Sequence, residues 1–103
     1  MFLIRDIMYC KPGQVRPMVE KFVALSKALD RRGLARMRVM TDFCAERYWT
    51  VVSEMEVPDL QAFERMVGAP RGSGEDEKEM GEIMKGYHDL VMEGRREIYR
   101  LEG

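Results

Sequence analysis

Two neighbouring stretches of the chain alternate between apolar and polar residues. The first is "ARMRVMT" at 35–41 and the second is "YWTVVSEMEV" at 48–57. A period of two is that of a half-buried β-strand. Because only the short polar loop "DFCAE" joins the two stretches, they predict a hairpin whose odd-numbered side chains face one core.

The shared parity restricts the register of this hairpin. Facing positions must sum to an even number, and sums of 90 or 92 place Arg36 or Arg38 opposite Glu54. A cross-strand ion pair contributes only about 0.2–1 kcal/mol, but it supports such a register. Independent solvated charges are the alternative.

The N-terminal third predicts a strand that runs into a helix. Residues 2–10 are rich in Phe, Ile and Tyr and too short for a stable helix, so they indicate a strand that ends at Pro12-Gly13. From Val15 the apolar residues recur every three or four positions, which predicts an amphipathic helix. Gly33 is a plausible stop for this helix.

The C-terminal half predicts two more helices and a strand. Asp59 is placed as the N-cap of a short helix. The segment 68–74 carries three glycines and a proline, and indicates a surface loop or a lid over a pocket. A second amphipathic helix is expected from residue 75 to a stop near Gly94, followed by a strand at 96–101.

This order of elements predicts a single α+β domain over residues 1–103. It is the order of a ferredoxin-like βαββαβ fold, with a four-stranded antiparallel sheet and the helices on one face. The even-numbered face of the hairpin is both apolar and charged: Arg36, Arg38, Met40, Tyr48, Val52, Glu54 and Glu56. We therefore expect a second copy of the chain to cover that face in a homodimer.

Composition excludes several classes of partner. A formal charge of -1 gives no field that attracts nucleic acid or anionic lipid, and no apolar run approaches membrane-spanning length. We expect a cytoplasmic protein with neither nucleic acid nor membrane as partner. Ten methionines suit an adaptable core, or alternatively a Met-lined ligand site. Cys10 and Cys44 are expected at one end of the sheet, either as a redox pair or as independent thiols.

Three stretches of the sequence carry a resemblance that spans nearly the whole chain. They are "MYCKPG" before the first helix, the hairpin "MRVMTDFCAERYWTVVSEMEV", and "PDLQAFERM" after it. Together they resemble the dimeric α+β barrel superfamily, particularly its NIPSNAP-like and antibiotic-biosynthesis-monooxygenase-like members. The resemblance implies that two sheets pack across a dimer. It also implies a small-molecule pocket between each sheet and its own helices.

The resemblance gives Trp49 and His88 as candidate catalytic residues. Haem-degrading monooxygenases of the superfamily use an asparagine with a tryptophan and a histidine, and this chain has no asparagine. His88 could act as a general base or an axial haem ligand. Structural roles, a core Trp49 and a packed His88 at a helix border, are the alternatives.

Arg5, Tyr9 and Tyr87 are the candidate ligand-binding residues. Arg5 and Tyr9 share one face of the first strand, and a guanidinium with a phenol suits a small anionic or aromatic ligand. The alternative is that Arg5 pairs with a local carboxylate. The resulting hypothesis is a homodimeric small-molecule-binding domain, and the rival is a cofactor-independent or haem-processing monooxygenase. The sequence specifies no cofactor and leaves catalysis open.

Overall fold

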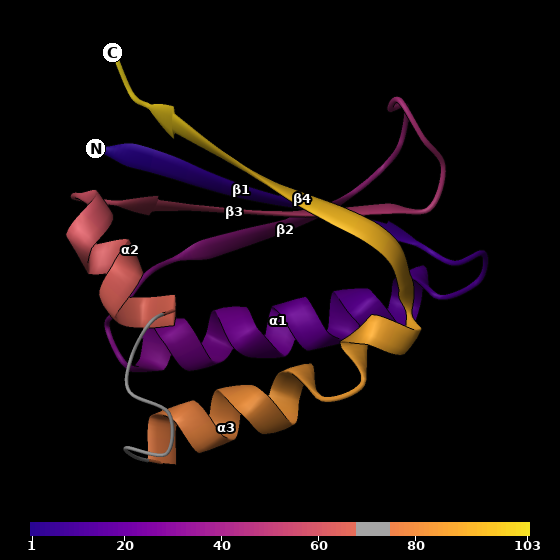
Figure 1. Cartoon of the computed structure of the whole chain (residues 1–103), viewed down its shortest axis with the longest axis horizontal. Coiled ribbons are helices and arrows are strands. Elements are labelled where there is room, and N and C mark those ends of the chain that lie inside the picture. Colours follow the sequence, from indigo (N-terminus) through magenta and orange to yellow (C-terminus); the bar gives the residue numbers. More distant parts are fainter. Residues whose placement is uncertain (68–74) are drawn as a thin grey trace.

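The computed structural model describes residues 1–67 and 75–103 as one antiparallel sheet with helices on one side (Figure 1). In chain order the elements are β1 (Phe2–Cys10), α1 (Val15–Arg31), β2 (Met37–Thr41), β3 (Thr50–Val57), α2 (Leu60–Val67), α3 (Glu75–Met84), the 3₁₀ turn η1 (Tyr87–Asp89) and β4 (Val91–Arg100). This order confirms the α+β, ferredoxin-like fold, with the second helical segment divided in two.

The sheet has the strand order β2-β3-β1-β4, and all neighbouring strands are antiparallel. In the β2–β3 hairpin Arg38 lies opposite Glu54, which confirms one of the two expected registers. The two termini meet at one end of the sheet, where the amide of Leu101 donates a hydrogen bond of 3.0 Å to the carbonyl of Met1.

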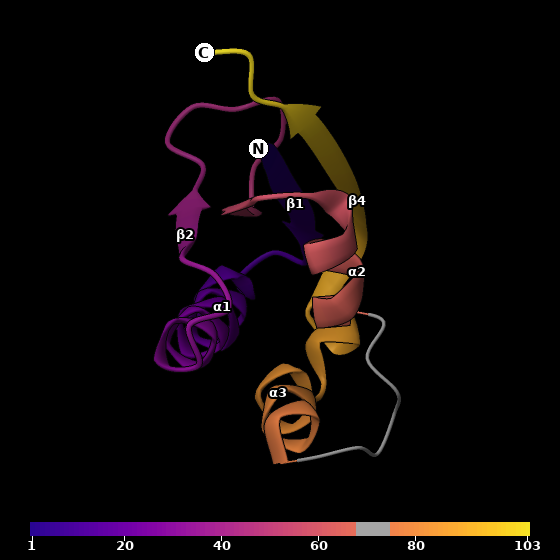
Figure 2. The same cartoon turned by 90° about the vertical axis from the view of Figure 1, so that its left-hand side faces the viewer.

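All helices lie on the same side of the sheet (Figure 2). Helix α1 packs on β2 and β3, and α3 packs on α1. The helix-facing side of the sheet holds the core, which confirms the expected orientation of the odd-numbered β3 positions. Two buried clusters form this core: Cys10, Met18, Phe22 and Val51, and Ile4, Val57 and Phe63.

The ends of the helices follow the expected local chemistry. Gly13 has φ +80° in the turn before α1, and Gly33 has φ +66° just after it, a left-handed conformation that favours glycine. The amides of Gly33 and Leu34 then donate back into the last turn of α1. At α2, Asp59 Oδ1 accepts a 2.7 Å hydrogen bond from the amide of Ala62, which confirms the N-cap.

The expected helix from residue 75 to Gly94 is too long. Helix α3 ends at Met84, because Gly86 takes φ +82° and stops it. The turn η1 follows, and β4 begins at Val91 rather than at residue 96. The loop or lid expected at 68–74 lies outside the described residues. Within them, no helix is long and apolar enough to cross a membrane.

Candidate functional site

The side of the sheet that faces away from the helices, here called the open face, carries a row of four alternating charges. One residue comes from each strand, because register places Arg38 beside Glu54, Glu54 beside Arg5, and Arg5 beside Glu97. Glu54 accepts from Arg38 at 2.6 Å and from Arg5 Nε at 2.7 Å. Arg5 Nη1 lies 3.7 Å from Glu97. The row forms a continuous chain of ion pairs across the sheet.

The next row along the strands is apolar. Met40, Val52 and Ile7 are register neighbours on β2, β3 and β1, and Arg95 of β4 completes the row. Ile7 is buried and Val52 is half-buried although no helix covers this side. These side chains form an apolar floor between charged groups.

Beyond the floor lies Tyr9, whose side chain is held from two directions. Only 6% of Tyr9 is exposed. Its hydroxyl oxygen accepts a 2.9 Å hydrogen bond from Arg95 Nη1. The guanidinium of Arg47 lies 4.2 Å from the centre of its ring and also pairs with Glu93. The phenol is therefore fixed, and its hydroxyl proton remains available to donate.

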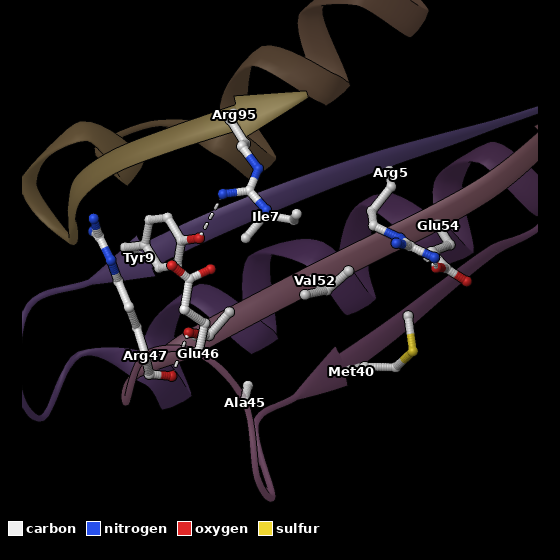
Figure 3. A pocket seen from close by; sticks show the side chains of 11 residues that line it. Arg5, Ile7, Tyr9, Met40, Ala45, Glu46, Arg47, Val52, Glu54 and Arg95 are labelled. Atoms are coloured by element: carbon white, nitrogen blue, oxygen red, sulfur yellow. Dashed lines mark hydrogen bonds and ion pairs between the residues drawn. The ribbon is translucent and has the colours of Figure 1, made fainter. Parts of the chain in front are cut away.

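These groups enclose a hollow of about 270 Å³, the open-face hollow (Figure 3). Its lining consists of Arg5, Ile7, Tyr9, Met40, Ala45, Glu46, Arg47, Thr50, Val52, Glu54 and Arg95. The carboxylate of Glu46 points toward the Tyr9 hydroxyl, while Arg5 and Glu54 lie at the other end of the floor (Figure 3). The hollow thus has an apolar middle and two polar ends.

Several polar groups of the open face shift the pKa values of one another. A hydrogen bond from Tyr99, with further bonds and fields from Arg95 and Arg5, holds the pKa of Glu97 below its usual value. The same contact raises the pKa of Tyr99. Hydrogen bonding to Glu97 and the Tyr9 oxygen raise the pKa of Arg95, so this guanidinium stays charged. Arg5 pairs with the carboxylates of Glu54 and Glu97, which was the alternative to a ligand-binding role for this residue.

The candidate residues from the sequence lie in three separate hollows. Arg5 and Tyr9 share the open-face hollow, on the side of the sheet away from the helices. Tyr87 and His88 line a second hollow, of about 430 Å³, at the edge formed by β4 and η1. Trp49 lines a third, beside Tyr48 and the start of α1. None of these three hollows is lined by both Trp49 and His88.

Trp49 departs from its expected place. It was expected as a strand residue on the helix-facing side, but β3 begins only at Thr50. Trp49 takes φ +62°, and 43% of it is exposed. The amide of Thr50 donates to Asp42 Oδ1 at 2.9 Å, and the carbonyl of Thr50 accepts from the amide of Asp42 at 3.2 Å, so the hairpin pairing begins at Thr50. The left-handed conformation of Trp49, directly before it, breaks the alternation. Trp49 is therefore not a core residue.

His88 and the cysteines also differ from parts of the sequence interpretation. His88 is exposed, lies in η1 rather than in a helix, and stacks on Tyr87 with ring centres 3.9 Å apart. Cys10 is buried in the core, which raises the pKa of its thiol, and Cys44 is exposed in the hairpin loop. Both thiols are free in this structure.

Sequence reasoning missed three residues of the open-face hollow. Arg95 falls between the expected helix stop near Gly94 and the expected strand at 96–101, so its position beside Tyr9 does not follow from the pattern. Arg47 and Glu46 lie in the hairpin loop, where no periodicity fixes a direction. The only sequence signal for this contact was the aromatic residue Tyr9 near the end of β1.

Comparison with known proteins agrees on the fold. No family model and no curated protein matches the sequence. Among solved structures, an uncharacterized NIPSNAP-like domain protein from Burkholderia xenovorans has TM-score 0.73 and 18% identity, covering 99% of this chain and 85% of that one. A NIPSNAP family protein from Agrobacterium tumefaciens has TM-score 0.75 and 9% identity, covering 96% and 90%. An antibiotic biosynthesis monooxygenase has TM-score 0.73 and 12% identity, with complete coverage of both chains. The chain has the fold of these NIPSNAP-like and monooxygenase-like proteins.

Proposed function

We propose that the chain is a homodimeric small-molecule-binding domain whose ligand lies in the open-face hollow. The observation that carries the proposal is the fixed, nine-tenths buried phenol of Tyr9, held by Arg95 beside an apolar floor on a side of the sheet that no helix covers. A recognition site needs such a concave apolar surface with a few oriented polar groups.

Pairing through the open face would close this hollow. Met40 and Tyr99 expose large apolar surfaces on the face and would gain cover from a second sheet. Covering the charged row leaves no carboxylate or guanidinium of that row unpaired, because Arg38, Glu54, Arg5 and Glu97 already pair with one another. An unpaired buried charge is what makes such a surface costly to bury. A twofold axis is the commonest way to pair one surface with itself.

The contacts of Arg5 favour an aromatic over an anionic ligand. The Arg5 guanidinium is engaged by Glu54 at 2.6 Å and by Glu97 at 3.7 Å, so an anion would have to compete with both carboxylates. A flat apolar ligand meets no such competition over Ile7 and Val52. The Tyr9 hydroxyl would donate one hydrogen bond to an acceptor on that ligand.

Light scattering at dilute concentration tests the dimer. The wild-type chain is expected at twice its 12.0 kDa mass. Val52→Asp places a charge in the middle of the open face and should give a monomer. Val23→Asp makes the same change on the exposed side of α1 and should leave the dimer intact. A wild-type monomer would overturn the proposed pairing.

Ligand-observed NMR with benzamide and benzoate tests the site. Benzamide is the neutral aromatic acceptor, and we expect it to bind better than benzoate. Tyr9→Phe keeps the ring but removes the donor, which should weaken benzamide about 2- to 10-fold, the value of one hydrogen bond. Tyr87→Phe makes the same change outside the hollow and should have no effect. Equal binding to wild type and Tyr9→Phe would contradict the assignment.

The rival function, a monooxygenase that uses Trp49 and His88, remains a prediction. It draws support from the fold shared with an antibiotic biosynthesis monooxygenase. Against it, the two residues line different hollows. Titration with haem separates the two functions, because a Soret shift that His88→Ala abolishes would favour the rival.

A further inference from the structure

Two of the ten methionines line the same hollow as the single histidine of the chain. This hollow, at the edge formed by β4 and η1 and here called the edge hollow, is not used by the proposed open-face ligand. Its lining consists of Asp6, Met8, Tyr87, His88, Val91, Met92, Glu93, Gly94, Arg95 and Arg96. Met8, Met92 and His88 each offer a neutral, soft donor atom.

Met8 reaches over β4 because the residue opposite has no side chain. Register places Met8 of β1 against Gly94 of β4. A Cβ added at Gly94 would come within 2.7 Å of Met8 Sδ. The thioether therefore lies over the β4 backbone, in space that any other residue at position 94 would occupy.

Met92 is the extra residue of a β-bulge. The register passes from Tyr9–Glu93 to Cys10–Val91, so Met92 has no partner on β1. Bulges change the direction of a side chain and recur beside functional sites. Met92 is 62% exposed, and its flexible side chain is free to turn toward the hollow.

His88 is presented by a defined turn. The amides of Asp89 and Leu90 donate to the carbonyls of Gly86 and Tyr87, at 3.1 and 3.0 Å. The imidazole stacks on the Tyr87 ring, which itself packs against the core. The imidazole is therefore exposed but held near the rim of the edge hollow.

The charged residues of the lining compensate one another. Arg96 pairs with Asp6 at 2.6 Å, Arg95 with Glu97 at 3.0 Å, and Glu93 with Arg47. A cation in the edge hollow therefore meets neither an unpaired guanidinium nor an unpaired carboxylate. The three donors are neutral and do not cancel the charge of a bound ion. A monovalent ion therefore leaves one uncompensated charge in the hollow, whereas a divalent ion would leave two.

From these placements we propose that the edge hollow binds Cu(I) through the thioethers of Met8 and Met92 and the imidazole of His88. Thioether ligands favour soft ions such as Cu(I), and imidazole also binds copper, whereas carboxylates and water suit the harder divalent ions. Among the side chains that the structure describes, no three of histidine, cysteine or carboxylate type form a group that could hold a metal ion. The thioethers are what complete the proposed ligand set.

Anaerobic competition with the Cu(I) chelator bicinchoninate tests the site. The Cys44→Ser background removes the exposed thiol, which would bind Cu(I) by itself. We expect one Cu(I) per chain, and binding about tenfold weaker or worse in Met92→Leu and in His88→Ala, because even outer-sphere changes cost about 10- to 100-fold in metal affinity. Met40→Leu makes the matched change on the open face and should bind as before. Loss of all Cu(I) binding in Cys44→Ser alone, or equal binding in every variant, would overturn the proposal.

A second readout locates the ion. In protein labelled with ¹³C at the methionine methyls, Cu(I) should shift the Met8 and Met92 signals and leave Met40 unchanged. A shift of Met40, or of no methionine, would also overturn the assignment. This measurement needs no substitution and is independent of variants that fold poorly.

Discussion

The two faces of the sheet use alternate residues of the same strands for different purposes. On the helix-facing side, Cys10, Val51 and Phe22 form a dry cluster without charges. On the open face, which the alternate residues of these strands form, Arg5 and Glu54 belong to a row of ion pairs. The comparison shows that strand parity separates the apolar core from the row of ion pairs, so a substitution can affect one face alone.

The largest expected difference between the faces is in packing. Phe22 is 3% exposed in the core, so Phe22→Ala should lower the free energy of unfolding by about 3–5 kcal/mol. Met40, on the open face, is 37% exposed, and Met40→Ala should cost well under half as much. Chemical denaturation of both variants at one protein concentration measures the difference. Equal losses would mean that the open face is as tightly packed as the core.

A smaller loss is expected when the charged row is broken at its centre. Glu54 is 7% exposed and accepts from both Arg5 and Arg38, so Glu54→Gln leaves two guanidinium groups around a neutral amide. Charge-assisted hydrogen bonds contribute about 1.5–3 kcal/mol each, and the exposure of Arg38 reduces the loss toward the lower value. Glu56→Gln, on the same strand and face but exposed, is the control and should change the free energy of unfolding little. A loss in Glu54→Gln no larger than in this control would show that the row contributes no stability.

The separation of the two faces by alternating residues ends at Trp49, just before β3 begins. Its φ of +62° costs a residue with a Cβ about 1–2 kcal/mol relative to glycine. Trp49→Gly should therefore be more stable than Trp49→Ala by about 1 kcal/mol, although both lose the indole. Thermal unfolding of the pair measures this difference. If Ala proves the better replacement, the left-handed conformation is not a constraint of the hairpin.

The same parity explains how far the sequence could predict this molecule. The hairpin register and the side of β3 that faces the helices follow from alternation, and the structure confirms both. The strand at residues 2–10 follows instead from its composition and short length, and it is confirmed too. The face of β1 that carries Arg5 could not be assigned, because apolar residues occupy both odd and even positions of that strand and give it no alternation. Its even positions turned out to face the helices.

The candidate site was less predictable because Glu46, Arg47 and Arg95 lie in segments where the sequence shows no alternation. The bulge at Met92 and the left-handed Gly86 shift β4 by several residues from the expected strand. Both features depend on backbone conformations that a helical stripe of apolar residues does not reveal. As a result Arg95 could not be placed beside Tyr9 from the sequence. The left-handed conformation of Trp49 is likewise not visible in the alternation, so Trp49 was expected in the core.

The smallest expected effect concerns protonation, and it is confined to the open face. The hydrogen bond from Tyr99 to Glu97, 3.0 Å long, is the main cause that lowers the pKa of Glu97. A lowered folded-state pKa contributes stability that is present above the unfolded-state value, about 4.3, and is lost as pH falls through the folded value. The raised pKa of Tyr99 adds stability below its unfolded-state value that is lost as pH rises through the folded one.

Tyr99→Phe removes this contact and keeps the ring, so the pKa of Glu97 should rise toward its ordinary value. Carboxyl ¹³C NMR during an acid titration follows Glu97 directly. Glu79 serves as an internal control on the helix side, because a hydrogen bond from Arg31, not a tyrosine, is the main cause that lowers its pKa. We expect Glu79 to titrate alike in both proteins. An unchanged midpoint for Glu97 would mean that Arg95 and Arg5, rather than Tyr99, stabilise its charge, and the charged row would then extend through β4 without help from a phenol.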